Sequence, residues 1–251
     1  MGLLSVTAVG TAGWNVPKAY TDQFPECGSH LERYAHRFNA VEINTSFYRP
    51  HRVATYERWA AAVPERFRFA VKVPRAITHE RRLENADEPL ARFLNEVAGL
   101  GPKLGPLLLQ LPPSLPFQRV TSSDFLQRLR RAVPGNIVCE PRHPSWFAPD
   151  VDALLADLLI ARAAVDPAPV PLAREPGGWR GLAYHRLHGS PRIYYSAYSP
   201  GALDALAERL AAEARDGVPN WCIFDNTAEF AATSNALSTL ERLTRAAGQR
   251  M

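Results

Sequence analysis

The sequence predicts an α/β fold in which residues 1–251 form one domain, a (β/α)₈ barrel of the TIM type. Three observations favour this class. The chain has 251 residues, and a barrel of this type typically needs about 250. Short apolar segments alternate with amphipathic helical segments, which favours a parallel sheet. Charged or amide residues follow most of the apolar segments, where such barrels carry their active sites.

Eight apolar segments have the length expected of buried strands. They follow one another about 30 residues apart, which is the size of one strand, one helix and their loops. Eight units of this kind favour closure of the sheet into a barrel. The predicted strands are centred near Val6, Val41, Phe69, Leu108, Val138, Ala163, Tyr184 and Ile223.

The segments between these strands show helical periodicity, with one exception. After Ser199, apolar residues from Leu203 to Ala214 recur at i, i+3, i+4 and i+7, which predicts an amphipathic helix with a serine cap. Similar stripes follow Pro89 and Pro149. Residues 166–181 read DPAPVPLAREPGGWRG, and this much proline and glycine predicts a loop in place of the sixth helix.

The composition excludes several classes of protein. Hydrophobic residues make up 46% and charged residues 22% of the chain, as in globular rather than disordered proteins. No apolar run approaches the ~18 residues that span a bilayer. The segment Leu3–Val9 lacks a basic flank and predicts a buried strand rather than a signal peptide, so a cytoplasmic location is expected. The three cysteines include no C-x-x-C pair and predict neither a disulfide framework nor a zinc site.

The charge pattern gives limited information about partners. The formal net charge is +4, which is compatible with an anionic ligand. The arginines are scattered and form no basic stripe, so nucleic-acid binding has no positive support. The chain also lacks the glycine-rich nucleotide motifs, the G-x-S-x-G nucleophile motif and the H-E-x-x-H zinc motif. No cofactor is predicted.

Polar residues end most of the predicted strands. Side chains alternate between the barrel interior and the helix layer, and this alternation directs charged groups from at least five strands into one mouth. The requirements of folding alone seldom bring such groups together, because a buried charge is costly unless it is paired. The residues expected at the mouth are Glu42, Asn44, Lys72, Gln110, Glu140, Arg142, Asp166, Arg186, His188, Asp225 and Asn226.

Two of these residues are singled out as catalytic candidates. Lys72 is one of only three lysines among 29 basic residues, and a buried lysine can have a lowered pKa and act as base, nucleophile or phosphate ligand. Its ammonium could instead reach solvent while its stem packs. His188 precedes Gly189 and is a candidate acid, base or metal ligand. Pairs such as Glu42–Arg186 would equally arise as salt bridges that close the barrel.

Aromatic residues in loops after the strands are candidates for stacking on a sugar or a base. Trp14, Tyr48, Trp146 and Tyr195 are the residues expected at this rim. His79 and His143 also lie in loops and are weaker candidates for chemistry. His185 has the opposite strand parity from His188 and is expected to pack outside the barrel.

A set of motifs covers nearly the whole chain: Gly10–Trp14, Val41–Tyr48, Phe69–Lys72, Ile77–His79, Leu109–Pro113, Glu140–Trp146, Tyr184–Gly189 and Phe224–Thr227. Their sequences and order resemble those of the YecE-like family, also called domain of unknown function 72. The resemblance implies a TIM barrel of about this length in a family without an established activity. The chain departs from the family pattern at Ala12, after Asp166 and at Asp225, which stands where asparagine is usual and adds a carboxylate to the mouth.

The first of three functional hypotheses is a cofactor-free enzyme that acts on a small anionic or sugar-like ligand. Lys72, Arg142 and Arg186 would hold the anion. Glu140 or Glu42 would move protons, and His188 would be a second acid or base. Gln110, Asn44 and the rim aromatics would contact the rest of the ligand.

The second hypothesis is an enzyme with a divalent metal, held by Glu140, Asp166, His188 and Asp225. These four residues end separate strands, in a pattern similar to xylose-isomerase-like barrels, which include sugar epimerases and the endonuclease IV phosphodiesterases. The third hypothesis is a non-enzymatic protein that binds nucleic acid or another partner.

Overall fold

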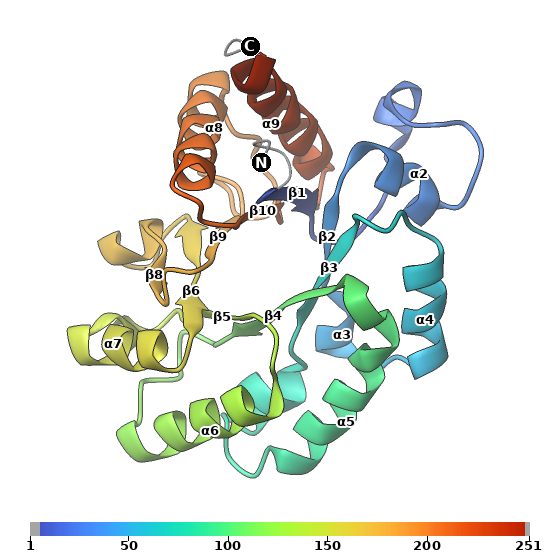
Figure 1. Cartoon of the computed structure of the whole chain (residues 1–251). Helices are drawn as coiled ribbons and strands as arrows, with labels where there is room; N and C mark the ends of the chain where they lie inside the picture. Colours follow the sequence, from blue (N-terminus) through green and yellow to red (C-terminus); the bar gives the residue numbers. More distant parts are fainter. Residues whose placement is uncertain (1–5, 249–251) are drawn as a thin grey trace.

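The computed structural model describes residues 6–248, which form a mixed α/β fold. The helices lie outside the strands, and the chain runs around them in sequence order (Figure 1). The strands are β1 (Thr7–Thr11), β2 (Ala40–Ile43), β3 (Arg68–Lys72), β4 (Leu104–Gln110), β5 (Ile137–Glu140), β6 (Ile160–Arg162), β7 (Ala164–Asp166), β8 (Gly177–Gly178), β9 (Ala183–Leu187) and β10 (Asn220–Phe224). The α-helices are α2 (His30–Arg37), α3 (Thr45–Tyr48), α4 (Val53–Ala61), α5 (Asp87–Val97), α6 (Arg119–Ala132), α7 (Pro149–Asp157), α8 (Pro200–Arg215) and α9 (Ala231–Gly248).

The strands form two sheets, in the orders β1-β10-β9-β7 and β2-β3-β4-β5-β6-β8. Their pairings are parallel except the short pairing of β6 with β8. Strands β6 and β7 follow each other with only Ala163 between them, and the Ala163 N–H donates to the Cys139 carbonyl at 2.9 Å. At the other junction, an isolated parallel bridge joins Ala12, just after β1, to Glu42 in β2.

The predicted strand positions agree with the structure. Seven of the predicted centres fall in or next to β1, β2, β3, β4, β5, β9 and β10, and the eighth, Ala163, lies between β6 and β7. The first strand begins at Thr7. Leu3 to Ser5 of the predicted strand lie outside the described residues. The close approach of β1 to β2 requires glycine at position 10, because a Cβ there would lie 2.0 Å from the Ala40 carbonyl oxygen.

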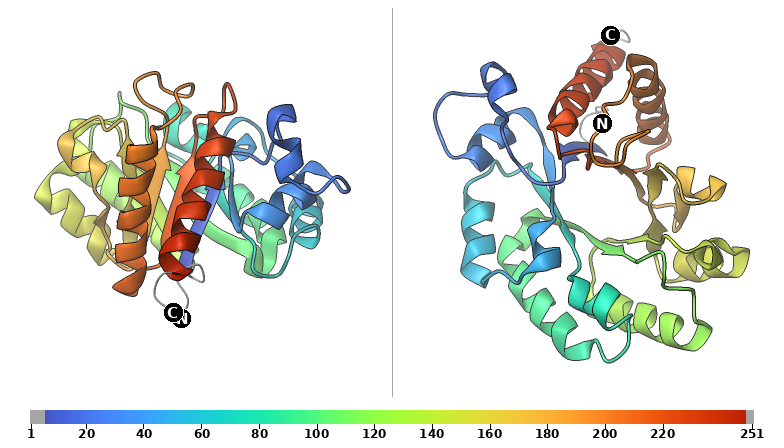
Figure 2. Two further views of the ribbon diagram at one scale, coloured as in Figure 1. Left: turned by 90° about the horizontal axis from the view of Figure 1, so that it is seen from above. Right: turned by 180° about the vertical axis from the view of Figure 1, so that it is seen from behind.

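The sixth helix is replaced by a loop, as the sequence predicts. Residues 167–182 contain the 3₁₀ turn η5 (Pro171–Arg174) and the two-residue strand β8, and no α-helix. The helix predicted after Ser199 is α8, and the Ser199 hydroxyl accepts the N–H of Ala202 at 3.3 Å. This helix lies beside α9 over the first sheet (Figure 2).

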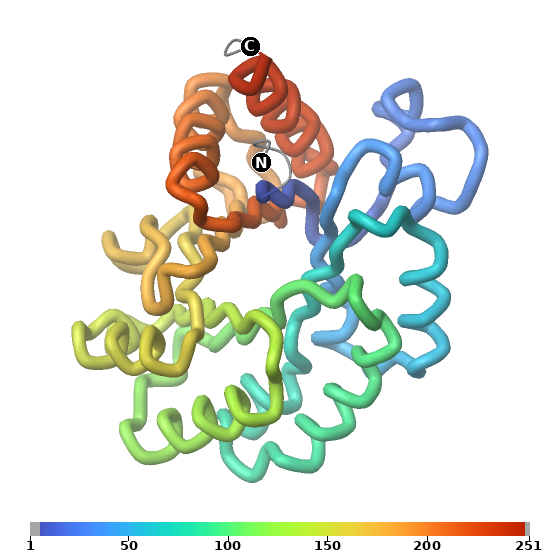
Figure 3. The backbone as a smooth tube through the Cα atoms, viewed as in Figure 1, coloured from blue at the N-terminus to red at the C-terminus, as the bar shows by residue number. Residues whose placement is uncertain are grey.

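The backbone path brings the first and last elements of the fold together. Helix α9 packs against β1, so the start and the end of the described chain meet along one side (Figure 3). Side chains from β2, β5 and β9 meet in one region, where Arg186 contacts both Glu42 and Glu140. No helix among residues 6–248 is both long and apolar enough to cross a membrane.

Candidate functional site

A buried network of ion pairs occupies the centre of this region. Arg186 on β9 is fully buried and forms ion pairs with three carboxylates from three other strands or strand ends. Its Nη2 lies 2.7 Å from Glu42 Oε1 and 3.0 Å from Asp225 Oδ2, and its Nη1 lies 3.2 Å from Glu140 Oε2. Tyr184 adds a hydrogen bond from its hydroxyl to Glu42 Oε2 at 2.8 Å. The charges and hydrogen-bonding atoms of these groups are therefore paired with one another below the surface of the site.

A second layer of the network lies nearer the solvent. His188 Nδ1 lies 3.0 Å from Asp225 Oδ2, and its Nε2 lies 3.4 Å from Glu140 Oε1. Arg142 Nη2 lies 2.9 Å from the same Glu140 oxygen and 3.2 Å from His188 Nε2. The Arg142 side chain is 23% exposed, so the guanidinium is the part of this layer that a ligand can reach.

The surroundings of the carboxyl groups keep them ionised. Burial alone would raise the pKa of Glu140, but Arg186, His188 and Arg142 together hold it well below its usual range. Burial alone would also raise the pKa of Asp225, but Arg186 and His188 lower it below its usual value. Burial would lower the pKa of Arg186, but the three carboxylates raise it well above the ordinary value. Glu140, Asp225 and Arg186 are therefore charged at neutral pH.

Lys72 ends β3 at the edge of this network. Its side chain is almost fully buried, with the residue 7% exposed, and its Nζ lies 4.1 Å from the centroid of the Phe47 ring. Within residues 6–248, Lys72 takes part in none of the ion pairs that hold the network together. Burial and the charge of Arg186 lower the pKa of Lys72 to about 8, and Glu42, Glu140 and Asp225 raise it only in part.

Three residues at the mouth carried little or no signal in the sequence. Phe47, on α3, lies under the Lys72 ammonium, and the His79 ring packs edge-on against it with centroids 5.0 Å apart. Burial, followed by Lys72 and Arg75, lowers the pKa of His79. The Tyr194 ring packs edge-on against His188 with centroids 5.9 Å apart. The spacing of polar strand ends could not identify them, because all three follow the strands in helices or loops.

The structure corrects the expectation for Asp166. The sequence places Ala164 and Asp166 on the inward face, but their neighbours in the sheet, His185 and Leu187, lie on the face opposite Arg186. Directly paired residues of parallel strands point to the same side. Val165, which pairs with Arg186, is therefore the inward residue, and Asp166 instead lines a separate cavity of about 570 Å³ beside α8.

Other expected ligand contacts also prove to be structural. Trp146 is completely buried, and its indole N–H donates to the Leu115 carbonyl at 3.0 Å. Asn226 is buried on the helix side, where its amide donates to the Ser196 carbonyl and to Asn235 Oδ1, both at 2.9 Å. Both side chains are therefore outside the reach of a ligand at the mouth.

The remaining candidates divide by exposure. Glu42 and Arg186 are fully buried and pair with each other inside the network. Gln110 is buried at the end of β4, opposite Glu140 in the sheet. Tyr48 is 71% exposed and lies over another hollow, with Arg75 and Glu80. Two further candidates, Trp14 and Asn44, line a cavity beside the charged network.

The proposed metal set does not converge. Glu140, His188 and Asp225 are neighbours, but Asp166 lies on the opposite face of its strand. The guanidinium of Arg186 already holds the other carboxylates, in the position where a cation bound by them would lie. Among residues 6–248, no group of three or more His, Cys, Asp or Glu side chains is arranged to hold a metal ion.

Comparison with known proteins identifies the family. The family described as "Protein of unknown function DUF72" matches residues 8–250. The chain belongs to the DUF72 family. The DUF72 chain is 34% identical over 144 residues to the UPF0759 protein YecE of Escherichia coli K12, covering 56% of this chain and 50% of YecE. It is 28% identical over 149 residues to the UPF0759 protein YunF of Bacillus subtilis, covering 56% of this chain and 52% of YunF.

Each of these matches spans about half the length of the curated relative. Solved structures resemble nearly the whole DUF72 chain. A DUF72 protein of Thermotoga maritima superposes with a TM-score of 0.77 at 24% identity, over 95% of this chain and 99% of that one. A DUF72 protein of Enterococcus faecalis superposes with a TM-score of 0.77 at 22% identity, over 95% of both chains. These similarities establish the fold and carry no assignment of activity.

Proposed function

We propose that the two sheets form one barrel of the TIM type, within a single domain of residues 1–251. The eight strands would be β1, β2, β3, β4, β5, the combined β6 and β7, β9 and β10. Two junctions support this arrangement. Strands β6 and β7 are separated only by Ala163 and belong to different sheets, and the bridge between Ala12 and Glu42 joins the other two edges. The mouth is then the carboxyl-terminal face, where such barrels carry catalytic groups.

We propose further that this mouth is the active site of an enzyme that transfers protons on a small anionic, sugar-like ligand without a cofactor. The observation that best supports this proposal is the state of Lys72, an almost fully buried amine with a pKa of about 8. At pH 7.5 such an amine is neutral in roughly a quarter of the molecules, against about one in a thousand for an ordinary lysine with a pKa of about 10.4. Lys72 is therefore prepared to accept a proton from a ligand.

The second layer supports the complementary roles. The partly exposed guanidinium of Arg142 is the group that would hold the anion, while Glu140 would orient it through the 2.9 Å contact. His188 lies between Asp225 and Glu140 and would return a proton to the ligand. In such a cycle Lys72 gains the proton that the ligand loses, and His188, as the second acid or base, supplies the proton that the ligand gains.

The pKa of Lys72 can be tested without knowledge of the substrate. The protein is labelled with a limiting amount of acetic anhydride between pH 6 and 11, and mass spectrometry follows each of the three lysines. We expect the labelling rate of Lys72 to rise with a midpoint near pH 8, and the exposed Lys18 serves as the internal reference in the same samples. Inorganic phosphate at millimolar concentration should slow the labelling of Lys72 and leave Lys18 unchanged.

Proton transfer itself can be followed by deuterium incorporation from D₂O into a panel of sugar phosphates and sugar acids, detected by NMR. The wild-type protein should exchange protons on at least one of them, and Lys72→Met should lower that rate at least about 100-fold. Val120→Ala, an exposed change on α6, is the control. A Lys72 midpoint above pH 10, with no protection by phosphate and no exchange, would refute the proposed function.

A further inference from the structure

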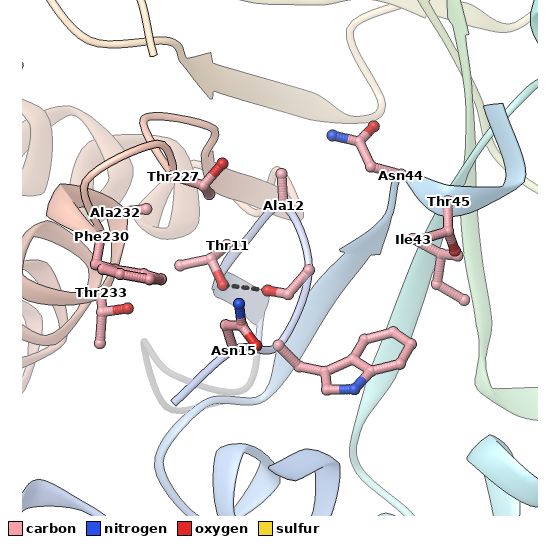
Figure 4. A pocket seen from close by; sticks show the side chains of 12 residues that line it. Thr11, Ala12, Asn15, Ile43, Asn44, Thr45, Thr227, Phe230, Ala232 and Thr233 are labelled. Atoms are coloured by element: carbon pink, nitrogen blue, oxygen red, sulfur yellow. Dashed lines mark hydrogen bonds between the residues drawn. The ribbon is translucent and has the colours of Figure 1, made fainter. Parts of the chain in front are cut away.

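A neutral cavity lies beside the charged mouth. It has a volume of about 410 Å³ and is formed where β1, β2 and β10 end and α9 begins (Figure 4). This volume falls within the range of about 300–1,000 Å³ that is typical of small-molecule sites. The cavity is lined by Thr11, Ala12, Gly13, Trp14, Asn15, Ile43, Asn44, Thr45, Thr227, Phe230, Ala232 and Thr233.

The lining combines hydroxyls, amides and aromatic rings. None of these twelve described residues carries a charge, although the adjoining network is built from charged groups. Thr227 and Phe230 lie on one side of the cavity, with Asn44 and Thr45 on the other (Figure 4). Neutral donors and acceptors beside aromatic faces suit a ring with several hydroxyl groups better than an ion.

The first turn of α9 does not convert the cavity into an anion site. A helix N-terminus attracts anions when its amide groups are free. Here the Ala232 N–H donates to the Asn226 carbonyl at 3.0 Å, and the Thr233 N–H donates to the Phe230 carbonyl at 3.1 Å. The charged end of a ligand would therefore lie at Lys72 and Arg142 rather than in this cavity.

Asn44 connects the cavity to the network. Its Nδ2 donates to Asp225 Oδ1 at 3.3 Å, and the other Asp225 oxygen lies 3.0 Å from His188 Nδ1. The Oδ1 atom of Asn44 is buried and has no hydrogen-bond partner within residues 6–248. Buried polar atoms are rarely left in this state. The nitrogen end of the same amide joins the lining of the cavity to the charged network.

We propose that this cavity is the subsite for the hydroxyl-rich ring of the ligand, so that the substrate class is a monosaccharide that carries one anionic group. The ring would lie among Trp14, Thr227 and Asn44, and the anionic group would extend to Lys72 and Arg142. This inference rests on the proposed function, because it assigns the substrate class of the same site. The anionic group is a phosphate or a carboxylate, and both are tested.

The test compares the affinities of probes that fill one part of the site or both. Inorganic phosphate, D-ribose, ribose 5-phosphate and glucuronate are titrated against the full chain by calorimetry. We expect ribose 5-phosphate or glucuronate to bind at least about tenfold more tightly than phosphate or ribose alone. Trp14→Ala should weaken binding of the sugar derivative about tenfold and leave phosphate binding unchanged. Lys72→Met should weaken both.

A second variant keeps the test decisive if Trp14→Ala unfolds the protein, since Trp14 also packs against Trp59 with ring centroids 5.0 Å apart. Thr227→Val removes one hydroxyl of the cavity with little change in shape and should weaken sugar binding alone, whereas Trp14→Phe should retain most of it. Equal affinities for phosphate and the sugar derivatives, with no effect of Thr227→Val, would overturn the subsite. If the wild-type protein does not bind phosphate and the pKa of Lys72 is that of an ordinary lysine, the proposed function is overturned instead.

Discussion

Replacement of Arg186 by methionine tests the buried network directly. The change removes the shared partner of three buried carboxylates. Glu140 would keep Arg142, and Asp225 would keep His188, but Glu42 would retain only the hydroxyl of Tyr184. Removing one partner of a buried ion pair costs about 3–5 kcal/mol. We therefore expect the free energy of unfolding to fall by about 5 kcal/mol at pH 7, a large part of the ~5–15 kcal/mol of an ordinary domain.

The stability of the wild type and that of the Arg186 variant should depend on pH in opposite directions where carboxyl groups titrate. In the wild type, the folded pKa values of Glu140 and Asp225 are lowered. Their contribution is complete above the unfolded values of about 4.3 and 3.9, and it is lost as the pH falls through the folded values. In the variant, the carboxyls left without Arg186 favour the neutral form. The variant should therefore gain stability relative to the wild type between pH 7 and pH 5.

Urea unfolding followed by far-ultraviolet circular dichroism measures both effects. Arg209→Met is the matched control, because Arg209 pairs with Glu175 at the surface, where the two side chains are 40% and 59% exposed. Such exposed pairs contribute at most about 1 kcal/mol. If Arg186→Met and Arg209→Met lose similar amounts of stability, or if the Arg186 variant gains no stability relative to the wild type between pH 7 and pH 5, the account of the network is wrong.

Two further predictions concern residues that the sequence assigned to ligand contacts. Trp146→Ala should lower the free energy of unfolding by about 3–5 kcal/mol, because it empties a fully buried site. The folded fraction should still bind phosphate with unchanged affinity in calorimetry, and a weakened affinity would restore Trp146 to the site. Addition of Mn²⁺ or Zn²⁺ should leave the thermal unfolding midpoint unchanged, since Asp166 faces away from Asp225 and Arg186 occupies the centre of the carboxylates. A rise of several degrees with either metal would contradict this arrangement.

Much of the site was accessible from the sequence. The alternation of side chains predicted that Glu42, Lys72 and Arg186 share the inward face, and Glu140 was expected beside them at a strand end. In the structure Glu42, Glu140 and Arg186 meet in one network, with Lys72 beside Phe47 at its edge. The method failed at Asp166. The sixth strand is interrupted at Ala163, and only the pairing with β9 reveals which residues share the face of Arg186. Alternation determines relative facing along a strand, but its absolute direction depends on the neighbouring strand.

The sequence by itself determined the order and spacing of the strands, the missing sixth helix and the polar character of the strand ends, because these follow from local periodicity and from proline and glycine content. Only the tertiary structure decided which charges remain available to a ligand. Glu42 and Arg186 neutralise each other across 144 positions of sequence, whereas Lys72 is left beside Phe47 with a lowered pKa. Burial and ion pairing depend on contacts between distant segments, and no local pattern records them.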